Sequence, residues 1–584
     1  MSDRKALLQV ALGQRPADIY ISGGRLVNVW TAEVLTGVGV AVAGDRIAYV
    51  GPDTGMIGQE TTVIDATGSY LVPGYIDAHA HVDTFLSPAA IQAALLPLGT
   101  TTLLSYTDDI CSAVGPLGLE YMLTATEGMG LGFYFALPPA CPSFPGVEGP
   151  DLFPVELVTR WAGHPRIRSL GEIPPWGRIL AGDREMLAKM QAMTGAGKRV
   201  DGHTTGARYG QLNALAASGV SSCHEALRAS EVLERIRLGL YVMLRHGSVR
   251  QDLPDLAPAL LANPGLDTSA VMLTPDFMSP DDIADRGYLN YPLEEAVRLG
   301  IPPLAALRMV TVNAARYLRL EEEVGVIAPG RRADILLLPS LTEFRPWLVI
   351  VGGQIVARDG EMLLPQPEAG MAPGFSLVPL WQGGWTSIPE DYFVPRVAGV
   401  NNGPASVPAI HLRSKTITTS RTVEVLMRDG LIRAGCEGYL ILAAPTAPER
   451  YPVTCFLSGF GGQVGGVAAS YGVGSGKLLV LGASPQDMRQ AFLRLVEMGG
   501  GMVIVHDGEV RAEFVLPIGG IQAAVGLSDL AASFQQAKRV LAELGCRLQD
   551  PIFSIHFLSL TAMPFIRITP YGVFDIRKQS IIYP

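Results

Sequence analysis

Between residues 86 and 319 the sequence alternates short apolar runs with helical ones, and this limits the possible folds more than any other feature. Runs such as TTTLLSY and AVMLTPD are separated by segments of helical character such as DREMLAKMQAMTGAG. Alternating strands and helices are typical of a parallel sheet, because a helix makes each return crossover. Several apolar runs end at a polar residue, as in a (β/α)8 barrel, where the strand ends carry the chemistry. We therefore predict a TIM barrel, an α/β fold.

The segments on either side of the predicted barrel have a different character. Residues 18–51 alternate short β-rich runs with Gly-Gly and Gly-Asp turns, and residues 325–360 return to this style, which favours a small antiparallel β domain. LPQPEAGMAPG is rich in Pro and Gly, which indicates a linker. The predicted parts are a split β-sandwich domain (1–73 and 320–363), the catalytic barrel (74–319), a linker (364–375) and a C-terminal α+β domain (376–584).

Composition restricts the class of function. At 584 residues with 48% hydrophobic residues, the chain can form several cores. A net charge of −10 argues against nucleic-acid or anionic-membrane partners, and no secretory signal or apolar stretch of bilayer-spanning length is present. Six scattered cysteines without a CxxC pair fit a reducing compartment. We expect a cytoplasmic homo-oligomer that acts on a small molecule, without nucleic-acid or membrane partners.

Two histidines stand one residue apart at the start of the predicted barrel, in LVPGYIDAHAHVDTF. SYLVP and YIDAHAHV are predicted to be strands, and residues two apart on a strand project from the same face. His79 and His81 can therefore share one cation, and histidine is the commonest metal ligand. By itself the pair is equally compatible with two separately hydrogen-bonded core histidines.

Four further potential ligands stand at predicted strand ends. They are Glu172 in SLGEIPPW, His203 in VDGHTTG, His224 in SSCHEA and Asp276 in MLTPDFMSP. In a barrel these side chains converge on the C-terminal mouth. One histidine at a strand end is usually structural, but the whole set is hard to explain in that way. Four histidines and two carboxylates can hold two divalent metal ions (Zn, Mn or Fe) with one carboxylate bridging, which is a recurrent hydrolytic arrangement.

These motifs resemble the amidohydrolase superfamily, and its adenine deaminase branch in particular. PGYIDAHAHV and GVIAPGRRADILLL look like the superfamily, whereas DGHTTGARYGQLNALAASGVSSCHE and the C-terminal PIFSIHFLSLTAMPFIRIT follow the branch. The resemblance covers nearly the whole chain and implies a metal-dependent hydrolase. It assigns His79, His81 and Asp276 to a first metal, Glu172 to the bridge, and His203 and His224 to a second metal.

The chain departs from this branch around the expected substrate. Asp-Pro-His-Glu-Ile after the third strand is replaced by residues 106–110 (YTDDI), and Thr-Asp-Asp-Arg-His-Pro by residues 275–280 (PDFMSP). A histidine-rich loop of the C-terminal domain is replaced by residues 473–477 (VGSGK), and Asn-Phe-Pro-Gly-Val after the bridging carboxylate by PPWGR. A scaffold that keeps its ligands while these groups change is expected to keep its reaction type and change its substrate.

The predicted chemistry is hydrolysis of a C–N bond by a metal-activated hydroxide. Asp276 is the candidate proton shuttle, and Glu172 is the second catalytic residue. Candidate substrate contacts are Asp108, Asp109, Trp176, His246 and Phe277, although Asp108 and Asp109 equally suit a helix N-terminus. The favoured substrate is an N-acyl or cyclic amide in a moderately apolar small molecule. The alternatives are deamination of adenine or a related aminopurine, and a non-catalytic binding protein on the same fold.

Overall fold

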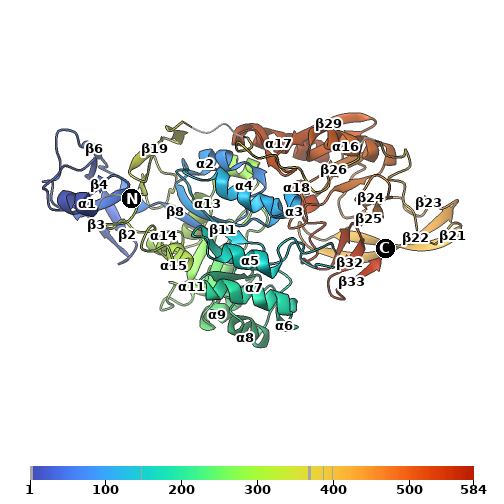
Figure 1. The fold of residues 1–584 in the computed structure, drawn as a ribbon, viewed down its shortest axis with the longest axis horizontal. Coiled ribbons are helices and arrows are strands. Elements are labelled where there is room, and N and C mark those ends of the chain that lie inside the picture. The colour runs from blue at the N-terminus through green and yellow to red at the C-terminus, as the bar shows by residue number, and fades with distance from the viewer. Residues whose placement is uncertain (1–3, 147, 366–369, 386, 398) are drawn as a thin grey trace.

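The computed structural model describes residues 4–146, 148–365, 370–385, 387–397 and 399–584. Its centre is a barrel of eight parallel strands within the described part of residues 74–319 (Figure 1). In chain order they are β8 (Tyr75–Ala80), β10 (Thr100–Ser105), β11 (Gly132–Leu137), β12 (Ile167–Ile173), β13 (Arg199–Gly202), β14 (Ser222–Cys223), β15 (Tyr241–Arg245) and β16 (Val271–Thr274). The predicted TIM-barrel fold is therefore confirmed.

Two sets of contacts close the barrel. β8 to β13 form one sheet and β14 to β16 another. At one seam the Ser221 amide donates to the Val200 carbonyl at 2.9 Å. At the other, Ala80 bridges Asp276 in parallel, and the His81 amide donates to the Asp276 carbonyl at 3.3 Å. The second seam places the start and the end of the barrel side by side.

Helices return the chain between the barrel strands, as the alternation predicted. Ser87 caps α2 (Pro88–Leu95) by accepting from the Ala90 amide, and Asp183 caps α7 (Arg184–Gly195) by accepting from two amides. The other helices of this region are α3 (Asp108–Val114), α4 (Leu117–Ala125), α5 (Val155–Ala162), α6 (Gly177–Leu180), α8 (Tyr209–Ala217), α9 (Ala229–Arg237), α10 (Leu253–Leu256), α11 (Pro258–Leu261), α12 (Pro280–Arg286), α13 (Asn290–Arg298), α14 (Pro303–Met309) and α15 (Val312–Leu318).

Strands from before and after the barrel share one sheet. β7 (Tyr70–Pro73) pairs antiparallel with β17 (Ile335–Leu338), and the seven-stranded order is β20-β19-β18-β17-β7-β2-β3. A second sheet has the order β5-β4-β1-β6, and a core that includes Ile21, Leu71 and Ile350 lies between the two sheets. The further elements are α1 (Arg4–Ala11), β1 (Ile19–Ser22), β2 (Arg25–Asn28), β3 (Glu33–Leu35), β4 (Gly39–Ala43), β5 (Arg46–Gly51), β6 (Thr62–Asp65), β18 (Leu348–Val351), β19 (Gln354–Arg358) and β20 (Glu361–Met362).

The predicted linker, 364–375, lies partly outside the described residues, because residues 366–369 are not described. Beyond it, the described C-terminal residues form a nine-stranded sheet of order β23-β22-β21-β25-β24-β27-β26-β28-β29. Its strands are β21 (Gly403–Leu412), β22 (Thr418–Arg428), β23 (Leu431–Ala434), β24 (Leu440–Ala444), β25 (Val453–Ser458), β26 (Gly466–Ala469), β27 (Leu479–Gly482), β28 (Gly501–His506) and β29 (Glu509–Val515). Helix α16 (Pro485–Met498) packs on this sheet.

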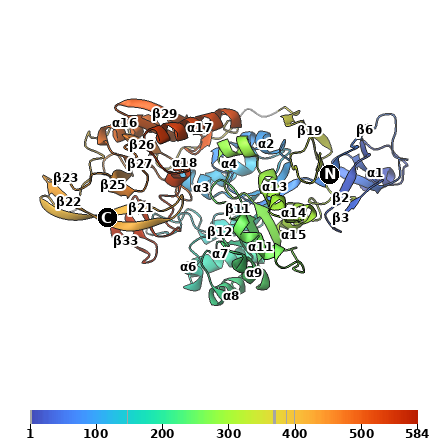
Figure 2. The ribbon, with the colours of Figure 1, turned by 180° about the vertical axis from the view of Figure 1, so that it is seen from behind.

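The C-terminal region packs directly on the barrel, as both views show (Figures 1 and 2). Helix α17 (Leu527–Glu543) lies against α12, and β30 (Gln522–Ala523) pairs with β9 (Phe85–Leu86), just after His81. The remaining elements are α18 (Pro551–His556) and a small sheet of β31 (Ile566–Thr569), β32 (Gly572–Asp575) and β33 (Ser580–Tyr583). No helix in the described ranges combines the length and apolar character of a bilayer-spanning segment.

Candidate metal centre

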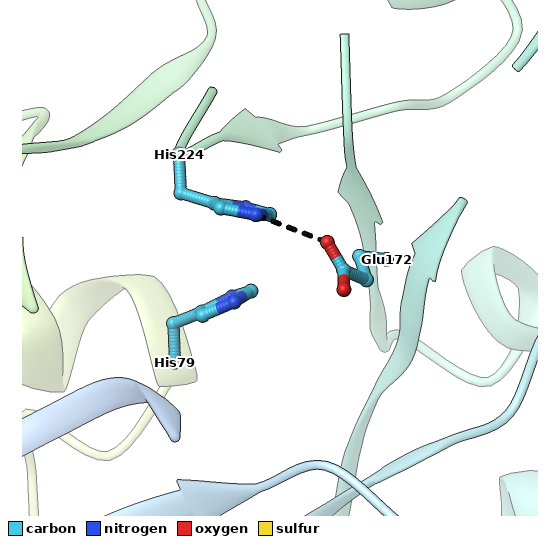
Figure 3. Close-up of side chains that lie close together, drawn as sticks. All are labelled: His79, Glu172 and His224. Atoms are coloured by element: carbon cyan, nitrogen blue, oxygen red, sulfur yellow. Dashed lines mark ion pairs between the residues drawn. The ribbon is translucent and has the colours of Figure 1, made fainter. Parts of the chain in front are cut away.

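The six candidate ligands converge at the C-terminal ends of the barrel strands. His79 lies in β8 and His81 directly follows it, and their ring centroids are 5.2 Å apart. Glu172 lies near the end of β12, His203 follows β13 and His224 follows β14. The imidazoles of His79 and His224 lie 3.9 Å apart between centroids, and both rings reach toward Glu172 (Figure 3). Residues distant in sequence thus form one cluster because parallel strands end at the same rim.

Glu172 lies between two groups of histidines. Its Oε1 is 3.5 Å from His81 Nε2, whereas its Oε2 is 2.5 Å from His203 Nδ1 and 3.0 Å from His224 Nε2. Burial by itself raises the pKa of this carboxyl, but His203 and His224 outweigh burial and hold the pKa well below its usual range. Because its two oxygens face different histidines, the carboxylate is suited to bridge two cations.

Asp276 contacts the histidines on the opposite side of the cluster. Its Oδ1 lies 3.4 Å from both His79 Nε2 and His81 Nε2. The backbone of Asp276 has a φ of +64°, a region that non-glycine residues occupy mainly under constraint. The loop from Gly247 touches this turn so closely that a Cβ at Gly247 would lie 1.9 Å from the Pro275 carbonyl oxygen. The contact between the two loops therefore holds Asp276 at the mouth of the barrel.

The structure adds a carboxylate that the sequence analysis did not identify as a ligand. Glu225, the residue after His224, has Oε1 at 3.6 Å from His224 Nε2 and Oε2 at 3.9 Å from His203 Nε2. His203, His224 and Glu225 offer ligand atoms that all lie within 4.8 Å of one another, as do His79, His81 and Asp276. In the sequence, only the position of Glu225 directly after His224 could have indicated that it is a candidate ligand.

A buried arginine balances the charge of these carboxylates. Arg245, the last residue of β15, contacts Glu225 through Nη1, which also lies 3.0 Å from Asp276 Oδ2. Its Nη2 lies 3.0 Å from Asp252 Oδ2. Burial opposes ionisation of Glu225 and Asp276, but Arg245 and the neighbouring histidines outweigh burial and hold the pKa of both carboxyls well below the usual range.

The buried nitrogen atoms of the cluster fit metal ligation. Both ring nitrogens of His79 and Nε2 of His81 are buried without a hydrogen-bond partner. Burial lowers the pKa of both imidazoles, which favours the neutral form that binds metal. Burial also acts to lower the pKa of His203, but Glu225 and Glu172 outweigh it and raise the pKa to about 9. A positive charge is therefore favoured between His203 and the carboxylates of Glu172 and Glu225. A bound metal ion would take the place of the proton on His203.

Two connected cavities open at the cluster. The inner one, of about 50 Å³, is lined by candidate ligands, by the polar Arg245, Arg250 and Thr416, and by apolar side chains from the barrel and the C-terminal region that include Val249, Phe277, Val473, Phe557, Leu560 and Met563. An outer cavity of about 420 Å³ shares Pro174, His203 and Met563 with it. Trp176 and Phe565 line the outer cavity.

The predicted substrate contacts lie at different places in this site. The Phe277 ring stacks on His81 with centroids 4.1 Å apart, and Phe277 lines the inner cavity. Trp176 lines only the outer one. His246 Nε2 lies 3.1 Å from the Tyr291 hydroxyl, and His246 lines neither cavity. Asp108 and Asp109 open helix α3 and also line neither.

Asp109 instead contacts the C-terminal region. The Gly474 amide donates to Asp109 Oδ1 at 2.6 Å, and Nε2 of buried His556 lies 3.7 Å from Oδ2. His556 also packs against Phe277 with ring centroids 5.7 Å apart. Sequence reasoning missed His556, because it has no histidine or carboxylate at ligand spacing. The C-terminal region thus forms part of the wall behind the candidate site.

The chain is similar to known proteins over almost its whole length. Residues 70–356 match the amidohydrolase family, and residues 415–580 match the adenine deaminase C-terminal domain. The chain is 34% identical to the adenine deaminase of Moorella thermoacetica over 589 residues, which cover 99% of this chain and 97% of that protein. It is 32% identical to that of Cenarchaeum symbiosum, with 99% and 94% covered. The crystal structure of dihydropyrimidinase from Brevibacillus agri is 15% identical, with a TM-score of 0.45, and covers 59% of this chain and 96% of that one.

Proposed function

Since this chain belongs to the amidohydrolase family and carries an adenine deaminase C-terminal domain, we propose that it deaminates adenine or a related aminopurine. It is a hydrolase that acts on carbon–nitrogen bonds. The similarity over almost the whole chain to adenine deaminases carries the choice of substrate class. The comparisons favour this alternative over the amide substrate that the sequence analysis preferred.

The proposal places two divalent ions in the cluster. His79, His81 and Asp276 would hold one, His203 and His224 with Glu225 nearby would hold the other, and Glu172 would bridge them. Divalent ions bound in this way lower the pKa of water and polarise the group under attack. His79 and Arg245 keep Asp276 ionised, so that Asp276 can accept a proton and pass it to the departing nitrogen.

One observation favours a second candidate, hydrolysis of an amide in an apolar molecule. A purine site needs fixed donors and acceptors around the ring, because unpaired polar groups are costly. The wall of the inner cavity away from the ligands is instead mainly apolar, with Phe277, Phe557 and Leu560 among its residues. An apolar acyl group or ring would suit that wall better than a polar base.

An assay of the purified, metal-loaded protein separates the two candidates. Ammonia release from adenine with a kcat/KM of roughly 10⁴ M⁻¹s⁻¹ or more supports the deaminase. Cleavage of cyclic amides or N-acyl amino acids without ammonia release from aminopurines supports the second candidate. Asp276→Asn, which keeps the size of the side chain, is the control for contaminating activity. If the protein turns over neither aminopurines nor amides, both candidate functions are contradicted.

A further inference from the structure

A second cavity, lined by arginines, lies at the end of the barrel opposite the candidate metal centre. Arg168 is the second residue of β12 and Arg199 the first of β13, whereas Glu172 and His203 lie at the other ends of the same strands. Arg316 in α15 and Arg319 just after it complete the cluster, and the cavity measures about 640 Å³. Figures 1 and 2 show α15 on the side that faces the N-terminal strands, away from the C-terminal region.

The four guanidinium groups have no carboxylate partner among the described residues within 4.0 Å. Among the residues that the structure describes, the Arg199 side chain donates to two backbone carbonyls, those of Tyr317 at 2.8 Å and Arg316 at 3.5 Å. The Nε of Arg168 is buried and has no hydrogen-bond partner. Buried donors are nearly always paired, so an unpartnered guanidinium nitrogen at a cavity indicates a place for an acceptor.

Aromatic rings hold three of these arginines in place without neutralising them. The Arg199 guanidinium lies 5.0 Å from the ring centroid of Tyr241 and 5.3 Å from that of Tyr317. Arg168 lies 4.9 Å from the Tyr134 ring, and Arg316 lies 4.5 Å from the Trp30 ring. Contact with an aromatic face orients a guanidinium group and leaves its charge intact. The cluster is therefore a preorganised group of cations in a chain of net charge −10.

The charges around the cavity are predominantly positive. Residues 321–323 place three glutamates on its rim, but the Glu323 carboxylate lies 2.6 Å from Arg46 Nη1. Lys198 lies close by, and burial together with Arg168 and Arg319 lowers its pKa, as expected where cations crowd. Two glutamates on the rim, together with Asp267, which interacts electrostatically with Arg316, therefore stand against four arginines and a lysine, and the cavity attracts anions.

We propose that this cavity binds an oligophosphate, a ligand with two or more linked phosphate groups. Arginine pairs with phosphate through two parallel hydrogen bonds, and the four arginines come from three separate segments. The cavity measures about 640 Å³, which leaves room for two or more linked phosphate groups. The ligand would join β12, β13 and α15 at the base of the barrel, and its binding does not depend on the proposed reaction.

Titration calorimetry of the metal-loaded chain with inorganic pyrophosphate tests the proposal. Arg319→Gln alters an exposed side chain, and Arg168→Gln alters the residue with the unpartnered nitrogen. Each variant should weaken binding at least tenfold, and the double variant should abolish it. Added salt should weaken binding in the unaltered protein. Arg168→Lys keeps the charge but loses the planar fork, and it should bind with intermediate affinity.

Arg160→Gln is the matched control. Arg160 is also exposed, lies 5.6 Å from the Trp161 ring and has no carboxylate partner within 4.0 Å among the described residues, so its replacement should leave binding unchanged. Absence of binding to the unaltered protein at millimolar pyrophosphate would overturn the proposal. So would full affinity in the double variant, which is the result expected if the anion binds only at the metal centre. Equal affinity for phosphate and pyrophosphate would reject an oligophosphate ligand.

Discussion

Replacing Arg245 with glutamine should destabilise the metal-free protein strongly. Arg245 is only 3% exposed, and its guanidinium contacts Glu225, Asp252 and Asp276, two of them at 3.0 Å. Glutamine removes the positive charge and leaves three carboxylates close together with no guanidinium among them. Because these groups are buried, water cannot fully replace the lost cation.

The expected loss can be estimated from this geometry. Removing one partner of a buried ion pair typically costs about 3–5 kcal/mol. With an m-value of about 3 kcal/mol/M in urea, the unfolding midpoint should fall by about 1 M or more. The assay is urea unfolding of chelator-treated protein, followed by tryptophan fluorescence. The exposed Arg160→Gln is the control, and its stability should change by no more than about 0.5 kcal/mol.

The effect of Arg245 should also depend on pH in a defined direction. Although burial opposes it, Arg245 holds the pKa of Glu225 below its unfolded value, and His79 and Arg245 together do the same for Asp276. A lowered carboxyl pKa contributes stability above the unfolded pKa of about 4, and this contribution is lost as the pH falls further. The difference between the two proteins should therefore be largest near pH 7 and shrink below about pH 4. A loss under about 1 kcal/mol at pH 7, where a buried pair should cost more, would refute the role assigned to Arg245.

Four further predictions concern the site. Chelation should lower the melting temperature of the unaltered protein but have much less effect on His79→Ala, because ions that bind the folded state stabilise it. Glu172→Gln should lose bound metal as well as rate, and full metal content would argue against a bridging role. Asp276→Asn should lower kcat by about 10²–10⁴ with a smaller change in KM, and near-normal turnover would remove it from the mechanism. Burial raises the pKa of Asp77 to about 7, so between about pH 4 and 7 this carboxyl is ionised in the unfolded chain but still protonated in the folded one, and stability falls as the pH rises through this range. Asp77→Asn should flatten this part of a stability–pH profile.

Local patterns were sufficient to predict the architecture and to name the main candidate ligands. Strand and helix periodicity depends on neighbours a few residues apart, so the alternation after residue 86 predicts a parallel barrel without a structure. His79 and His81 stand out because one strand carries both, and the ends of the other strands point to Glu172, His203, His224 and Asp276. Parallel strands end at a common rim, so these residues could be brought together by topology alone.

Tertiary structure alone decided which charges compensate one another and what closes the site. Arg245 lies 20 residues from Glu225 and 31 from Asp276, and nothing in the sequence pairs the arginine with either carboxylate. His556, in the C-terminal region, contacts Asp109 and Phe277 of the barrel. No residue near His556 in the sequence indicated these contacts. Asp109, for which the sequence left a substrate contact and a helix start open, lies in the first turn of α3 and accepts a hydrogen bond from Gly474. Such pairings depend on burial and through-space distance, which are properties of the folded chain that periodicity and motif spacing do not contain.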